Sequence, residues 1–318
     1  MSLAQSASGR PQYLGHLLIA ALIAVLLVVM YLNAPTFFRV NNLVNVLVQA
    51  SILGILAVGL CFVFVGGGID LSLPATLAFA GIVGAILMRD TQAVWIGPPA
   101  MLAIGTAIGC FNGLAVGLLG MTPFVVTLAT MTVVGGISVW LTESQSIYGH
   151  PYLFEDIFLF RLLGLPVSVW FFFLVVIVGQ LVIDRAPFGR RLRAAGTNAR
   201  AATIARVPTR RVIWLSYVIA GLAAGLTAIL LVARLGSASA KLGSDALLLD
   251  VISACVIGRV SIYGGVGTPV GVAIGALVVT LITNSLNMFG ISFFASLVVK
   301  GAIILALVYI DTLMRKAP

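Results

Sequence analysis

Apolar positions follow one another along most of the chain, and polar positions are confined to short breaks. The first apolar run covers Leu17–Leu32, and later runs cover residues 93–141, 162–183, 212–233, 246–258 and 260–299. A helix that crosses the hydrocarbon core of a bilayer needs about 20 apolar residues. The runs therefore predict an all-α polytopic membrane protein with about ten transmembrane helices. Because they occupy the chain from end to end, we expect a single membrane domain over residues 1–318.

Composition supports this class. Only 8% of the 318 residues are charged, and the mean hydropathy is +1.18. Soluble domains contain about 25% charged residues. A chain with so few charges cannot cover its folded surface against water, so we expect lipid to cover part of it.

Glycines within the runs recur every four residues, which lines one helix face with small side chains. This spacing is typical of close helix packing in membranes. The glycines that follow it are Gly105, Gly109, Gly113, Gly117, Gly221, Gly225, Gly267, Gly271 and Gly275. The three cysteines also lie inside apolar runs and lack metal-ligand spacing, so we expect small core residues and no metal site.

Positive charge gathers in one segment. Eight of the 18 Lys and Arg residues lie between Arg185 and Arg211, and the positive-inside rule assigns them to the cytoplasm. Arg10, Arg315 and Lys316 favour the same side. Six crossings before this segment and four after it satisfy these demands, so we expect both termini in the cytoplasm. A basic patch can also bind nucleic acid, but cytoplasmic retention is the plainer cause and we expect no nucleic-acid partner.

The basic segment also has helical propensity. Alanine pairs favour helix, Gly189 and Gly196 punctuate the segment, and Pro208 ends it. We expect two short helices on the cytoplasmic face. They are either a solvated collar or a docking surface for a partner.

A glycine-rich break interrupts the apolar pattern at Gly66-Gly67-Gly68 and is followed by Asp70, Ser72 and Pro74. Irregular backbone at membrane depth is tolerated only where it is buried in protein or faces water. Asp70 therefore either lines a translocation pathway or braces the break by accepting backbone N–H groups. We favour bracing, because Asp beside Gly commonly bonds local backbone.

Several other polar side chains interrupt apolar helices. They either form interhelical hydrogen bonds, which is the commoner use, or line a pathway. These side chains are Asn112, Thr127, Thr130, Asn284 and Asn287. Lys300 lies inside the last run and needs a partner; we expect Asp70 or Asp250.

No catalytic constellation is evident. His16 and His150 lie far apart, and neither has a nearby Cys or Ser partner. A phosphate-binding loop needs Gly-Lys-Ser or Gly-Lys-Thr, whereas Ala, Val and Arg precede Lys241, Lys300 and Lys316. We therefore expect no catalytic residues and no cofactor in this chain.

Four stretches, in order, resemble the ribose-type (carbohydrate) permeases of bacterial ATP-binding cassette importers. They are residues 67–72 (GGIDLS), 123–131 (PFVVTLATM), 188–198 (FGRRLRAAGTN) with Ala201-Ala202, and 233–238 (ARLGSA). Leu249-Asp250, residues 264–268 and the Asn284, Leu286 and Asn287 pattern also agree. The resemblance covers the chain from about residue 40 to its end.

The resemblance implies a type II importer-like fold in the bacterial inner membrane and a sugar pathway shared with a second permease subunit. It also implies a separate cytoplasmic ATPase, which would bind ATP and Mg, and a periplasmic sugar-binding protein. The loop at about 185–211 would couple to the ATPase. Its coupling residues would be Gly189, Arg190, Gly196, Asn198, Ala201 and Ala202. Gly196 would supply the bend between two helices, Asn198 would cap the second, and the two alanines would present a flat face.

The sequence departs from the family pattern at four places. Arg206-Val207 stands where the family has Gly-Ile, and Arg259 stands in its GG-T-S segment. Arg200 and Leu248 replace acidic residues. These departures leave partner and substrate details open. The identity of the sugar is also open. The rival classes are an ion-coupled secondary transporter, a channel or scaffold, and an importer permease for branched-chain amino acids.

Overall fold

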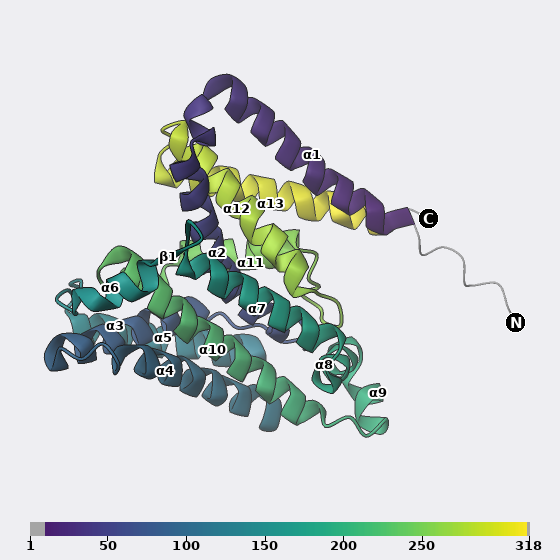
Figure 1. The fold of residues 1–318 in the computed structure, drawn as a ribbon. Helices are drawn as coiled ribbons and strands as arrows, with labels where there is room; N and C mark the ends of the chain where they lie inside the picture. Colours follow the sequence, from purple (N-terminus) through teal and green to yellow (C-terminus); the bar gives the residue numbers. More distant parts are fainter. Residues whose placement is uncertain (1–9, 317–318) are drawn as a thin grey trace, which may run out of the picture. The chain divides into compact units, whose positions relative to one another are not determined.

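The structure is a computed structural model that describes residues 10–316, and it is built almost entirely of helices (Figure 1). The strands within this described part are β1 (Arg161–Leu162) and β2 (Leu165–Pro166), which form one antiparallel hairpin. The predicted all-α class is therefore confirmed. The chain divides into two compact units, residues 47–277 and residues 1–46 with 278–318.

Seven helices between residues 10 and 316 are long and apolar enough to cross a membrane. They are α2 (Val40–Val65), α3 (Leu73–Thr91), α4 (Gly97–Gly113) with the π-helical turn η2 (Leu114–Leu118), α5 (Pro123–Thr142), α7 (Val167–Asp184), α10 (Thr209–Leu235) and α12 (Pro269–Met288). The remaining helices are α1 (Arg10–Asn33), α6 (Tyr152–Leu159), α8 (Pro187–Thr197), α9 (Ala199–Ile204), α11 (Asp245–Ile257) and α13 (Phe293–Lys316), with 3-10 turns η1 (Pro35–Phe38) and η3 (Ala240–Gly243).

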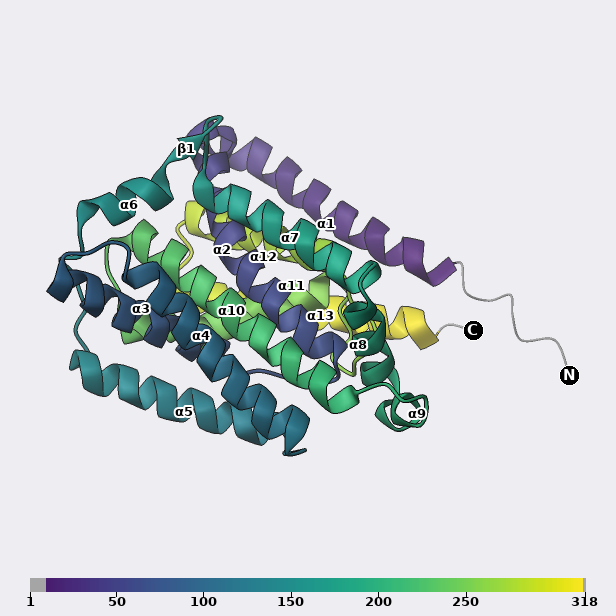
Figure 2. The same ribbon diagram turned by 60° about the horizontal axis from the view of Figure 1, so that its bottom comes forward.

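The larger unit is organised around α3, α4 and α10, which contact one another (Figure 2). The predicted glycine seam lies between α4 and α10. A Cβ added at Gly105 would meet the backbone of Gly221 and Gly225, and one at Gly109 would meet the backbone of Tyr217 and Gly221. The four-residue spacing therefore marks a place where two helix backbones approach closely.

A second glycine seam joins α12 to α11. A Cβ at Gly271 would meet the Gly258 carbonyl group, and one at Gly275 would meet the Ala254 carbonyl group. Small residues thus allow close helix packing at both seams.

The predicted helix break is present. α2 ends at Val65, and α3 begins at Leu73 with Pro74 in its first turn. Gly67 has a φ of +78°, a left-handed backbone that glycine adopts without a steric penalty. We call this irregular segment between α2 and α3 the first break (residues 66–72). A similar irregular segment lies between α11 and α12, and we call it the second break (residues 258–268).

The smaller unit contains α1, η1, the start of α2, the end of α12, and α13. Phe37 is fully buried and packs edge-on against Phe38 at 5.1 Å. Asn42 at the start of α2 and Asn284 on α12 exchange two side-chain hydrogen bonds, of 3.1 and 3.0 Å. Such reciprocal amide bonding satisfies two polar groups within an otherwise apolar contact.

Candidate functional site

The first break is braced by Asp70. This side chain is only 1% exposed, and its Oδ1 accepts hydrogen bonds from the Ser72 backbone N–H at 2.9 Å and the Ser72 hydroxyl at 2.6 Å. An Asp side chain that bonds the backbone two residues later closes a local turn. This is the bracing geometry expected for a carboxylate beside glycines.

The bracing extends across two neighbouring helices. Asn112 on α4 donates to the Ser72 hydroxyl at 2.8 Å, and Thr130 on α5 donates to Asn112 Oδ1 at 2.6 Å. All four side chains are buried. A continuous hydrogen-bonded chain, Thr130–Asn112–Ser72–Asp70, therefore connects α5 through α4 to the first break.

The Ile69 carbonyl is a second anchor point of the first break. It accepts from the Tyr217 hydroxyl at 3.0 Å and from the Thr127 hydroxyl at 3.4 Å, which also bonds its own helix at Pro123. Tyr217 on α10 is fully buried and was not singled out from the sequence. The available signal was a tyrosine inside an apolar run, since a buried Tyr hydroxyl usually finds a partner.

Five of the polar residues predicted for a pathway or helix break thus lie together in the larger unit: Asp70, Ser72, Asn112, Thr127 and Thr130. Their contacts are local or interhelical hydrogen bonds. The two remaining amides belong to the smaller unit. There, Asn284 bonds Asn42, a residue that the sequence reasoning missed, while Asn287 is exposed. A pathway role for these seven residues stays a prediction.

Lys300 lies on α13 and Asp250 on α11, and both side chains are half-buried. Each has an interaction within the protein. The pairing of Lys300 with Asp70 or Asp250 stays a prediction.

The basic segment forms α8 and α9, as expected, and Asn198 separates them. Asn198 has non-helical backbone angles (φ −157°, ψ 93°), and its side chain accepts the Ala201 backbone N–H at 2.9 Å. This is the expected cap, which satisfies one of the unpaired donors at a helix start. The interpretation of Gly196 as the bend was wrong, because Gly196 lies within the last turn of α8.

Gly196 instead permits a close approach of three backbones. A Cβ there would clash with the Val65 carbonyl oxygen at the end of α2 and lie 2.7 Å from the Gly265 nitrogen. Gly265 also donates to the Val65 carbonyl at 2.9 Å. A Cβ on Gly264 would lie 2.9 Å from the Gly67 Cα atom. The end of α8 therefore lies against both breaks at once.

The expected flat alanine face requires a second correction. Ala201 is exposed, but Ala202 is only 5% exposed, because adjacent helical residues point in different directions. The exposed surface of α9 instead includes Ile204, which is 80% exposed and which the sequence reasoning missed. Gly189 is buried against the backbone of Val182 and Ile183 at the end of α7. Arg190 is exposed.

Two departures from the family pattern share one conformation. Arg206 has a φ of +59° and Arg259 a φ of +62°. Both values lie in the left-handed region that favours glycine. Arginine therefore stands at two positions whose backbone suits the glycine of the family pattern.

Within residues 10–316, no three His, Cys, Asp or Glu side chains come together in a metal-ligand arrangement. Cys61 and Cys255 are buried free thiols, and Cys110 is a half-buried one. The polar groups of the larger unit are arranged to stabilise irregular backbone between membrane helices. The class that this fold and site define is a polytopic all-α membrane protein with braced helix breaks.

Comparison with known proteins agrees with this class. The family model for the permease component of branched-chain amino acid transport systems matches residues 42–308. Over 315 residues, the chain is 33% identical to the ribose import permease protein of Escherichia coli (strain K12). The aligned region covers 96% of this chain and 98% of the relative. No solved structure matches the chain.

Two further relatives come from the same strain. The D-allose transport system permease protein is 33% identical over 288 residues, covering 90% of this chain and 87% of the relative. The L-arabinose transport system permease protein is 32% identical over 294 residues, covering 92% and 89%. The chain belongs to this permease family and is a multi-pass protein of the bacterial inner membrane.

Proposed function

We propose that this permease forms the pathway of an ATP-binding cassette importer for a ribose-like monosaccharide. The observation that carries the proposal is the near full-length similarity to permeases named for ribose, D-allose and L-arabinose. Weak hydroxyl and amide contacts suit sugar release, because tight binding would slow passage. Asn112, Thr127 and Thr130 carry such groups, which in this structure are buried and hydrogen-bonded within the larger unit.

The energy source would be a separate cytoplasmic ATPase that binds ATP and Mg. This chain has no Gly-Lys-Ser or Gly-Lys-Thr sequence with which to hold a nucleotide phosphate. The surface for docking the ATPase would be α8 and α9, which carry exposed arginines and the exposed Ile204.

The orientation follows from charge and helix order. α1, α2, α3, α4, α5 and α7 would cross before the basic segment, and α10, α11, α12 and α13 after it, which places both termini in the cytoplasm. Three further basic residues favour this orientation, namely Arg10, Arg315 and Lys316. The structure does not describe their side chains. A second permease subunit, identical or homologous, would complete the pathway, and a periplasmic binding protein would deliver the sugar.

Purification with native partners and reconstitution test the proposal. The tagged permease is isolated from its own membranes with its bound ATPase, and the complex is placed in proteoliposomes. With the binding protein present, uptake of radiolabelled ribose, allose or arabinose is expected to require Mg-ATP and to disappear when ATP is omitted. Uptake driven by an ion gradient without ATP would instead identify a secondary transporter.

The family model's own description supplies the second candidate, a permease for branched-chain amino acids. Radiolabelled leucine in the same proteoliposomes separates the two candidates. We expect no ATP-dependent leucine uptake.

A further inference from the structure

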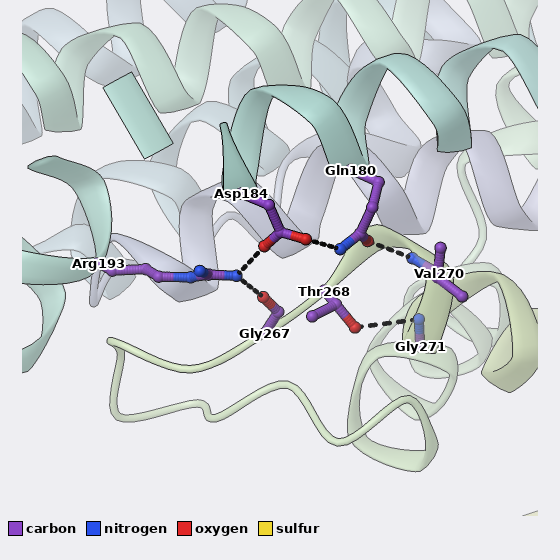
Figure 3. Close-up of polar contacts among 7 residues, drawn as sticks. All are labelled: Gln180, Asp184, Arg193, Gly267, Thr268, Val270 and Gly271. Atoms are coloured by element: carbon purple, nitrogen blue, oxygen red, sulfur yellow. Dashed lines mark hydrogen bonds and ion pairs between the residues drawn. The ribbon is translucent and has the colours of Figure 1, made fainter. Parts of the chain in front are cut away.

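The start of α12 is capped by a residue from another helix. The first N–H groups of a helix have no partner within it. Here the Thr268 hydroxyl accepts from the Gly271 N–H at 3.2 Å, and the Val270 N–H donates to Gln180 Oε1 at 3.1 Å (Figure 3). Gln180 lies on α7. The end of the second break is therefore fixed partly by a side chain distant in sequence.

Gln180 is itself held in place by two charged residues. Its Nε2 donates to Asp184 Oδ2 at 2.5 Å, and Asp184 Oδ1 accepts from Arg193 on α8 at 2.7 Å (Figure 3). The amide has one acceptor end and one donor end. Because Asp184 accepts from the donor end, the acceptor end is directed toward Val270.

Arg193 also contacts the second break directly. The nitrogen that donates to Asp184 lies 3.4 Å from the Gly267 carbonyl oxygen. A Cβ on Gly179 of α7 would lie 3.2 Å from Pro269 Cγ, so α7 packs closely on the first residue of α12. α7 and α8 thus hold the junction between the second break and α12 through side-chain bonds and packing.

The Asp184–Arg193 pair is poorly placed to serve stability. The two side chains are 44% and 34% exposed, and exposed ion pairs contribute little to folding free energy. Their positions nevertheless determine the direction of Gln180 and the contact with Gly267. The arrangement favours a mechanical role.

We propose that Gln180, Asp184 and Arg193 are positioning residues, a relay through which movement of α8 shifts the start of α12 and the second break during transport. The relay deepens the proposed function, since it rests on an ATPase that docks on α8 and α9. A displacement of α8 carries Arg193 with it, and both Asp184 and the Gly267 carbonyl follow through their hydrogen bonds.

The test compares Arg193→Gln and Gln180→Leu with Arg161→Gln, an exposed arginine on β1 that lies outside the proposed docking surface. In the reconstituted complex, we expect both relay variants to retain the ATPase and to hydrolyse ATP. Sugar imported per ATP should fall at least about fivefold, on the order of one lost hydrogen bond. Arg193→Lys should recover part of the loss, and Arg161→Gln should match the wild type.

Hydrogen exchange on the permease alone in nanodiscs gives a readout that is independent of transport. The Val270 amide should exchange about fivefold faster in Gln180→Leu and Arg193→Gln, because its acceptor is lost or misdirected. It should be unchanged in Arg161→Gln.

Three results would overturn the relay: an import ratio in both variants equal to that of Arg161→Gln, loss of ATPase binding in Arg193→Gln, or unchanged exchange at Val270. A wild-type complex that imports no sugar with ATP would reject the proposed function itself. In that case the relay would lose its role even if the exchange rates changed. The two failures are therefore distinguishable.

Discussion

At the scale of single residues, two features are notable: buried polar side chains that brace the first break, and two arginines with a left-handed backbone. Asp70 and Ser72 convert a glycine-rich break into a fixed turn, and Asn112 joins that turn to a neighbouring helix. Arg206 and Arg259, in contrast, have a left-handed backbone that suits glycine and is strained by a Cβ atom. Local strain at these arginines has a measurable consequence.

Replacing Arg206 with glycine is expected to stabilise the folded protein by up to about 1 kcal/mol, because the left-handed backbone no longer opposes a Cβ. Thermal unfolding in detergent measures the change as a rise in Tm. The matched control is Arg200→Gly within α9, where glycine should lower the Tm. A Tm for Arg206→Gly as low as that of the control would contradict the explanation.

At the scale of elements, the end of α8 packs closely against other backbone segments. Gly196 lies between the Val65 carbonyl and Gly265, so the end of α8 contacts the end of α2 and the second break. The two breaks also approach each other, at Gly67 and Gly264. The short helix α8 is therefore placed to act on two irregular segments that join membrane helices.

Gly196→Ala is expected to destabilise the permease by about 1–3 kcal/mol, the usual cost of overpacking, and to abolish sugar import. The added methyl group must displace α8 from the Val65 carbonyl. Ala194→Ser, an exposed position on α8, should leave Tm and import unchanged. Unchanged import by Gly196→Ala would show that the contact with the breaks is dispensable.

Gly196→Pro should still insert into the membrane but should no longer bind the ATPase. Co-purification with the ATPase measures this loss.

At the scale of the whole molecule, charge orients the chain and hydropathy places it in the membrane. Eight of the 18 basic residues gather between Arg185 and Arg211, whereas Glu155 and Asp156 lie on α6, in the connection between α5 and α7. The proposed cytoplasmic retention of the basic segment would set the direction of every crossing. The orientation can be measured directly.

Cysteine labelling should find α9 inside the cell and α6 outside. On a background in which Cys61, Cys110 and Cys255 are replaced by alanine, a membrane-impermeant maleimide should label Tyr152→Cys in intact spheroplasts. It should label Arg200→Cys only after permeabilisation. Both positions are exposed, so access depends on the side of the membrane. Labelling of Arg200→Cys from outside would reverse the proposed topology.

The sequence by itself determined the membrane class, the family, the break before Asp70 and the cap at Asn198. These features depend on composition or on neighbours within a few residues, so a linear pattern contains them. Only the tertiary structure decided that Gly196 is a contact and not a bend, and that Ala202 is covered. It alone brought Gln180 to Val270, because helical spacing identifies a face but not the distant element that meets it.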